Sequence, residues 1–141
     1  DAEPEEVRAV VDSGVVTVVQ LHGAEDAAYI TALHRALPRT PVIKAARPAG
    51  LAEAARLGAD ALLVDGPRPG SGEPFDWTQL NPTRLPLILA GGLTPETAGA
   101  AARLGVTALD VSSGVETAGV KDPAKIRAFV AAARQPSGKE T

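Results

Sequence analysis

The sequence contains no cysteine, few aromatic residues and only two histidines. Without cysteine the chain forms no disulfide, binds no metal through thiolate and carries no thiol nucleophile. Two histidines are too few for a histidine-rich zinc site, and His34 falls on a predicted helix, so we predict no metal site. The apolar runs are far shorter than the roughly 20 residues that a membrane-spanning helix needs.

Basic residues are not in excess either. The net charge is −3, with acidic and basic side chains interspersed, so the sequence offers no basic surface for nucleic acid. The acidic start, from Asp1 to Glu6, lacks the basic and then apolar pattern of a signal peptide. We therefore expect a soluble, cytoplasmic protein that binds neither nucleic acid nor a membrane.

The sequence does contain a regular alternation of strand and helix patterns. Short apolar runs predict five strands, at residues 15–21, 42–45, 61–65, 87–90 and 108–111. Helical patterns lie before, between and after most of them, at residues 1–12, 24–37, 50–57, 94–104 and from 122 onward. This alternation predicts a parallel α/β sheet.

The spacing of glycines favours one kind of parallel sheet. Gly14, Gly58 and Gly105 each end a helix before an apolar strand, and they lie 44 and 47 residues apart, which is two βα units each time. Such even repetition favours a (β/α)₈ TIM barrel over a doubly wound sheet. A complete barrel takes about 250 residues. We therefore predict a partial barrel of about five parallel strands over residues 1–134, and a disordered tail at 135–141.

Polar residues mark the carboxyl ends of the predicted strands, where parallel α/β proteins bind ligands. They are Gln20 and His22, then Lys44, Asp65 and Asp110. Asp65 precedes a long Gly/Pro loop at 66–76 rather than a helix, which favours a functional role over a helix cap. Asp110 needs a partner if it is buried, and Lys44 is the candidate, so an ion pair and a ligand contact both remain open.

Small residues form two successive turns after the last two strands. Gly91-Gly92 follows one strand, and Ser112-Ser113-Gly114 follows the next. Residues this small let backbone N–H groups approach an anion closely. The loops after strands 7 and 8 are the usual phosphate site of a (β/α)₈ barrel. We predict that these five residues form a phosphate-binding site, called here the phosphate cup.

Several longer motifs resemble one enzyme family. They are QLHG at 20–23, LLVD at 62–65 followed by GSGxxFDW at 70–77, AGGL at 90–93, DVSSGVE at 110–116 and GVKDP at 119–123. Their order and wording resemble phosphoribosylanthranilate isomerase, and FDW together with DVSSGVE is highly specific. The resemblance covers nearly the whole chain.

The resemblance implies an Amadori rearrangement in tryptophan biosynthesis, catalysed on a (β/α)₈ barrel without metal or organic cofactor. The substrate is a small phosphosugar, and the reaction class is that of an aldose–ketose isomerase, an intramolecular oxidoreductase. By resemblance Asp65 is the general acid. Gln20, His22 and Asp110 are expected around the ring-opened sugar. The amides around Gly92 and Ser112–Gly114 are expected to hold the phosphate.

Two functional residues of the family have no counterpart here. Its general base is a cysteine on the first strand, and an arginine on the second strand meets the anthranilate carboxylate. The resemblance aligns the start of this chain with the third helix of the family, so we expect the first three strands to be missing. The isolated chain should then be inactive and self-associate through open sheet edges.

Two other functions remain as alternatives. One is another phosphosugar barrel enzyme, such as a thiamine phosphate synthase or an indole-glycerol phosphate synthase, although FDW and DVSSGVE argue against it. The other is a non-catalytic partial barrel that binds phosphate or a partner chain, and the absent base supports it.

Overall fold

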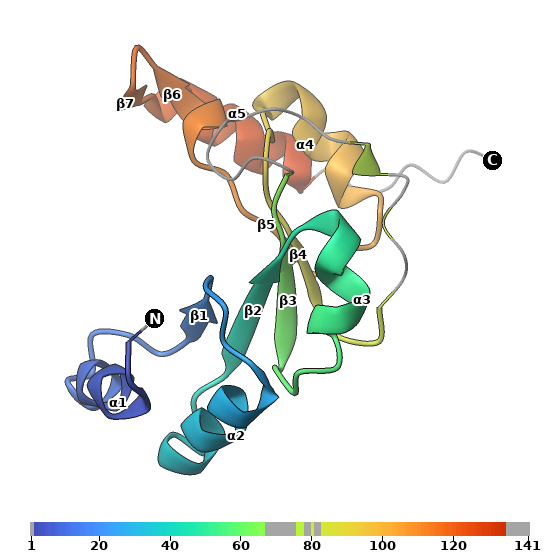
Figure 1. Cartoon of the computed structure of the whole chain (residues 1–141). Coiled ribbons are helices and arrows are strands. Elements are labelled where there is room, and N and C mark those ends of the chain that lie inside the picture. The colour runs from blue at the N-terminus through green and yellow to red at the C-terminus, as the bar shows by residue number, and fades with distance from the viewer. Residues whose placement is uncertain (1, 67–75, 78–79, 81–82, 135–141) are drawn as a thin grey trace.

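The computed structural model describes residues 2–66, 76–77, 80 and 83–134. Within them, five parallel strands form one sheet in the order β1-β2-β3-β4-β5 (Figure 1). The strands are β1 (Val19–Leu21), β2 (Val42–Ala46), β3 (Ala61–Val64), β4 (Leu87–Leu89) and β5 (Ala108–Leu109). Because the strands follow one another across the sheet without a reversal of order, they form a segment of barrel wall rather than a doubly wound sheet. The predicted fold class is confirmed.

Helices connect or flank these strands. They are α1 (Pro4–Asp12), α2 (Ala27–Ala36), the 3₁₀ turn η1 (Pro48–Gly50), α3 (Leu51–Ala54), α4 (Pro95–Ala102), the 3₁₀ turn η3 (Ser113–Val115) and α5 (Pro123–Ala133). A hairpin of β6 (Glu116–Thr117) and β7 (Val120–Lys121) precedes α5. Helices α1, α4 and α5 begin with a proline, where the missing N–H would be unpaired anyway.

The core lies between one face of the sheet and the helices. Val19, Leu21 and Val42 pack with Ile30 and Leu33 of α2. Leu62, Val64 and Leu89 pack with Ala98 and Ala101 of α4 and with Phe129 of α5. Since side chains alternate along a strand, the residues between them face the other side of the sheet, the inside of the barrel wall.

Several predicted element boundaries were wrong. Strand β1 begins at Val19 rather than Val15, and Val15 is 76 % exposed. Strand β1 starts there because β2 starts at Val42. The first pair between the two strands is Val19 with Val42, and the residues before Val19 have no strand beside them. Strand β5 stops at Leu109, and the helix predicted at 50–57 is a 3₁₀ turn followed by the single turn α3.

In the described part of the chain, β1 pairs only with β2, and β5 pairs only with β4. Both outer strands therefore have the unpaired edge that was predicted, while self-association remains a prediction. No helix among the described residues has the length and apolar character needed to cross a membrane. The predicted tail at 135–141 and most of the loop at 66–76 lie outside the described residues.

A buried ion pair joins β2 to the loop after β1. Lys44 Nζ donates to Glu25 Oε2 at 2.8 Å and to the Gly23 carbonyl at 2.7 Å. The two side chains are only 6 % and 7 % exposed. Burial raises the pKa of Glu25, but the hydrogen bonds from Lys44 and from backbone amides, with the ammonium charge, outweigh it and hold that pKa below its ordinary value.

Of the two alternatives left open for Asp110, the ion pair with Lys44 does not form, because Lys44 pairs with Glu25. Strand β2 continues through Ala45 and Ala46, so Lys44 lies in its middle rather than at its end. Two residues after Val42, it shares the helix-facing side of the sheet and reaches Glu25 instead.

Replacing Lys44 with methionine should lower the free energy of unfolding by about 3–5 kcal/mol at neutral pH, because it leaves Glu25 buried and unpaired. Since the folded-state pKa of Glu25 is lowered, the stability it contributes is present above its ordinary pKa and is lost as the pH falls through the lowered value. Urea unfolding over a pH series should therefore show that the difference in unfolding free energy between wild type and Lys44→Met becomes smaller in acid.

The control is Arg8→Met, which breaks the exposed Arg8–Asp12 pair at 3.3 Å and should change the unfolding free energy little. Equal stability of wild type and Lys44→Met at neutral pH would contradict the role given to the buried pair.

Candidate active site

Backbone hydrogen bonds bring three strand ends to the same edge of the sheet. The amides of Asp65, Ala90 and Asp110 donate to the carbonyls of Ala46, Val64 and Leu89, at 3.2, 2.8 and 2.8 Å. Each donor is the first residue after its strand, so the ladder runs one step past β3, β4 and β5. The loops that follow therefore start side by side.

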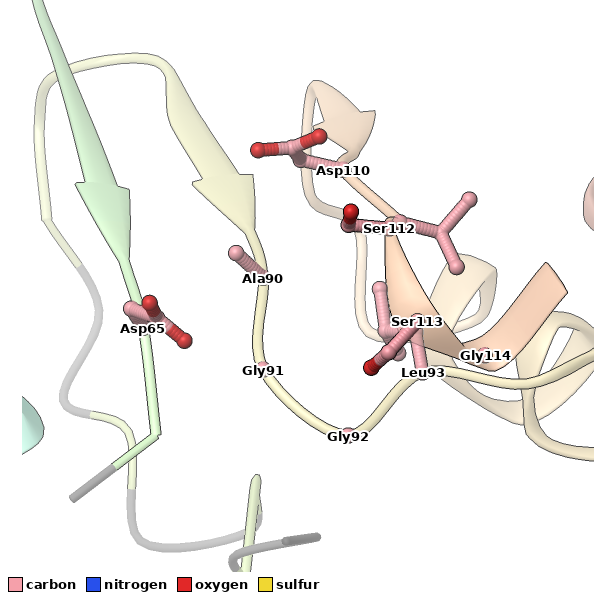
Figure 2. Close-up of a pocket in the computed structure, with 10 residues that line it drawn as sticks. Asp65, Ala90, Gly91, Gly92, Leu93, Asp110, Ser112, Ser113 and Gly114 are labelled. Carbon is pink, nitrogen blue, oxygen red and sulfur yellow. The ribbon is translucent and has the colours of Figure 1, made fainter. Parts of the chain in front are cut away.

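These loops enclose a hollow of about 110 Å³ (Figure 2). Its wall is made of Asp65, Ala90, Gly91, Gly92, Leu93, Asp110, Val111, Ser112, Ser113 and Gly114. The structure thus brings all five residues of the predicted phosphate cup together with Asp65 and Asp110. In Figure 2 the Asp65 carboxylate faces the Gly91–Gly92 turn from one side, and Ser113 faces it from the other.

The loops approach one another so closely that two positions admit only glycine. A Cβ atom on Gly91 would collide with the Gly66 nitrogen and lie 2.6 Å from Asp65 Oδ1, and Gly91 has a φ of +81°. A Cβ atom on Gly114 would overlap the carbonyl of Leu93. Backbone therefore packs against backbone where the three loops meet.

Three residues that line the hollow have backbone amides without an acceptor in the described part of the chain. They are Gly92, Leu93 and Ser113. Helix α4 starts directly behind them, with Thr94 as its N-cap, and the positive end of its dipole favours an anion. Free amides at a helix start and beside a second small-residue turn suit a phosphate group.

A second hollow of about 240 Å³ adjoins the first. His22, Gly23, Ala45, Ala46, Arg47 and Asp65 line it. Asp65 therefore borders both hollows, and it is half-buried, with Oδ1 accepting from the Gly66 amide at 2.8 Å. Gln20, in the middle of β1, is exposed and lines neither hollow.

Arg47 was missed by the sequence analysis. It follows directly on β2 and is exposed at the second hollow. The available signal was Pro48, because a residue before proline favours an extended backbone and so prolongs a strand. Because the strand was predicted to end at Ala45, Arg47 was not recognised as a residue at its carboxyl end.

Asp110 also differs from its prediction. It follows β5 rather than lying within it, and it is exposed. Its charge is solvated, so it needs no buried partner. Among the described residues, no group of three or more His, Cys, Asp or Glu side chains is arranged to hold a metal ion.

The fold and the position of the hollows define a protein of the (β/α)₈-barrel class, in which loops at the carboxyl ends of the strands build the site. Residues 1–132 match the family model of N-(5'-phosphoribosyl)anthranilate (PRA) isomerase. The chain belongs to this isomerase family, and the resemblance predicted from the motifs is confirmed.

Individual relatives agree. The chain is 46 % identical over 133 residues to the N-(5'-phosphoribosyl)anthranilate isomerase of Lactiplantibacillus plantarum, a match that covers 92 % of this chain and 62 % of the relative. The crystal structure of phosphoribosyl anthranilate isomerase from Thermus thermophilus matches with a TM-score of 0.76 and 42 % identity, over 94 % of this chain and 68 % of that one. The Thermotoga maritima enzyme matches with a TM-score of 0.80 and 34 % identity, over 94 % and 69 %.

The chain thus spans about three fifths of the length of the L. plantarum relative. A different phosphosugar barrel enzyme, one of the alternatives left open by the sequence, is not favoured by these matches. A further phosphoribosyl anthranilate isomerase structure, 30 % identical with a TM-score of 0.72, is a complex with reduced 1-(o-carboxyphenylamino)-1-deoxyribulose 5-phosphate.

The close approach of Gly114 to Leu93 can be tested by Gly114→Ala. The added methyl group must displace one of the two loops, so we expect a loss of about 1–3 kcal/mol in the free energy of unfolding. Gly99→Ala is the matched control, because a Cβ atom there meets nothing nearer than 3.5 Å and the residue lies within α4. It should stabilise the chain by about 1 kcal/mol. Denaturant unfolding measures both, and a neutral Gly114→Ala would disprove the tight loop contact.

Proposed function

We propose that this chain supplies the phosphate site and the general acid of a phosphoribosylanthranilate isomerase. The reaction is the Amadori rearrangement of N-(5'-phosphoribosyl)anthranilate in tryptophan biosynthesis, an intramolecular oxidation and reduction of the aldose–ketose type. The observation that carries the proposal is the position of Asp65 on the wall shared by the two hollows. One hollow suits the phosphate, and the carboxyl group stands between it and the space for the rest of the substrate.

The chemistry assigns a role to each part of this site. An acid must protonate the ring oxygen so that the aminoribose ring opens, and a base must then take the proton from C2 so that the carbonyl moves. We assign the acid to Asp65. We assign the 5'-phosphate to the phosphate cup and the opened sugar to the second hollow, which His22 lines, while contacts of Gln20 and Asp110 with the sugar stay predictions of the resemblance. The related isomerase that was crystallised with a deoxyribulose 5-phosphate derivative supports a substrate of this class.

The base is proposed to come from outside this sequence. In the family pattern it is a cysteine on the first strand, and the sequence contains no cysteine. The unpaired edges of β1 and β5 are the places where further barrel strands would pair. We therefore propose that phosphate binding belongs to this chain and that turnover requires the remainder of a barrel.

Phosphate binding can be tested by thermal unfolding. Millimolar inorganic phosphate should raise the melting temperature of the chain, because ligand bound to the folded state adds about 2.7 kcal/mol at one hundred times the Kd. Ser113→Asp places a negative charge in the cup and should abolish the shift. Ser13→Asp, at the end of α1, should keep it. Sodium chloride at matched ionic strength controls for screening, and identical melting curves with and without phosphate would refute a formed cup.

The role of Asp65 requires a complete barrel, made by joining the chain to the segment of the L. plantarum isomerase that it does not match. There Asp65→Asn should lower kcat by about 10²–10⁴, the contribution of a positioned general acid, with little change in KM. Asp60→Asn is the control, because Asp60 precedes the same strand at its other end and accepts from the Val42 amide at 2.7 Å. Near wild-type turnover by Asp65→Asn would remove it from the mechanism.

A further inference from the structure

One lysine outside the cup is fixed to its wall. Lys121, the last residue of the β6–β7 hairpin, donates to the carbonyl and to the Oγ of Ser112, both at 3.0 Å. It also donates to Glu116 Oε1 at 2.6 Å. An ammonium group has three donors, and all three are used here.

The contact matters because of what Ser112 does. Ser112 lines the cup, and its backbone is neither helical nor extended, so no helix or ladder pattern holds it in place. Its hydroxyl accepts from the ammonium group, which leaves its own proton for another acceptor. An anion in the hollow supplies such an acceptor.

The hairpin itself is anchored at both ends. The Thr117 hydroxyl donates to Asp122 Oδ2 at 2.8 Å, and the Asp122 amide donates to the Val115 carbonyl at 2.9 Å. Asp122 also caps α5. Lys121 is therefore held in one place, although its side chain is 51 % exposed.

Glu116 opposes the charge of Lys121. An exposed ion pair of this kind contributes little to stability. At the rim of an anion site, however, a carboxylate that shares the ammonium group weakens its attraction for a bound dianion. The two side chains are thus expected to have opposite effects on phosphate affinity.

We propose that Lys121 is a positioning residue of the phosphate cup: it fixes Ser112 with its hydroxyl proton available to the phosphate, and it adds positive charge at the rim. The inference rests on the proposed function and extends it to a residue outside the wall of the hollow.

The test is calorimetric titration of the full chain with inorganic phosphate. Lys121→Met should weaken binding about tenfold or more, the size of one charge-assisted hydrogen bond. Glu116→Gln should strengthen it. Lys125→Met is the matched control, because Lys125 donates to the Glu116 carbonyl at 2.6 Å but does not touch Ser112. It removes the same charge near the same hairpin and should change affinity far less.

A double-variant cycle adds a measurement that general destabilisation would not reproduce. Ser112→Ala should weaken binding, and Lys121→Met should cost less in that background than alone. Melting curves without phosphate confirm folding, and Lys121→Arg replaces Lys121→Met if the latter unfolds. Two outcomes overturn this inference alone, provided that the wild type binds phosphate. In one, Lys121→Met binds phosphate with wild-type affinity. In the other, Lys121→Met and Lys125→Met lose the same amount of phosphate affinity. Absence of binding by the wild type overturns the proposed phosphate site as well.

Discussion

The site depends on the contact of bare backbone among three neighbouring loops. Gly91 lies against Asp65 and Gly66, and Gly114 lies against the Leu93 carbonyl, at distances that leave no room for a side chain. The ladder bonds that continue past β3, β4 and β5 fix where each loop starts. Because the loops cannot separate without losing this packing, the amides of the cup are held in place, which would lower the ordering cost of the phosphate binding proposed here.

The other half of the site is fixed by charge instead of by close packing. The Lys44–Glu25 pair ties the loop after β1 to the middle of β2, and Glu25 also accepts from the Gly23 amide at 2.9 Å. His22 directly precedes Gly23, whose carbonyl and amide take part in these hydrogen bonds, and His22 lines the second hollow. A buried pair of this kind contributes little net stability over an apolar pair, yet it fixes a single arrangement because breaking it leaves a charge in the core.

The sequence predicted the parts of the site that depend on local chemistry. The two turns of small residues and the aspartate before the Gly/Pro loop can be recognised from the sequence around them. All of them line the first hollow. The failures concern strand ends. Whether Lys44 or Arg47 stands at the carboxyl edge depends on where β2 ends, which is two residues after Lys44 and one residue later than predicted. The start of β1 depends on where β2 begins. Such limits are set by pairing between strands, which one segment of sequence does not record.

The two hollows are built by different parts of the sheet. The first hollow, which contains the phosphate cup, is built from the loops after three adjacent strands, β3 to β5, and needs no contact across the barrel axis. The second hollow uses the loops after β1 and β2, and Asp65 is common to both. Under the proposed function, holding the phosphate is therefore assigned to one part of the barrel wall. The proposed proton transfer from C2 needs a base that reaches the substrate opposite Asp65, and we assign that base to the strands that would close the wall. Under the proposed function, binding energy gathered at the phosphate positions the distant reacting carbon, and Asp65 at the junction of the two hollows is placed to act on it.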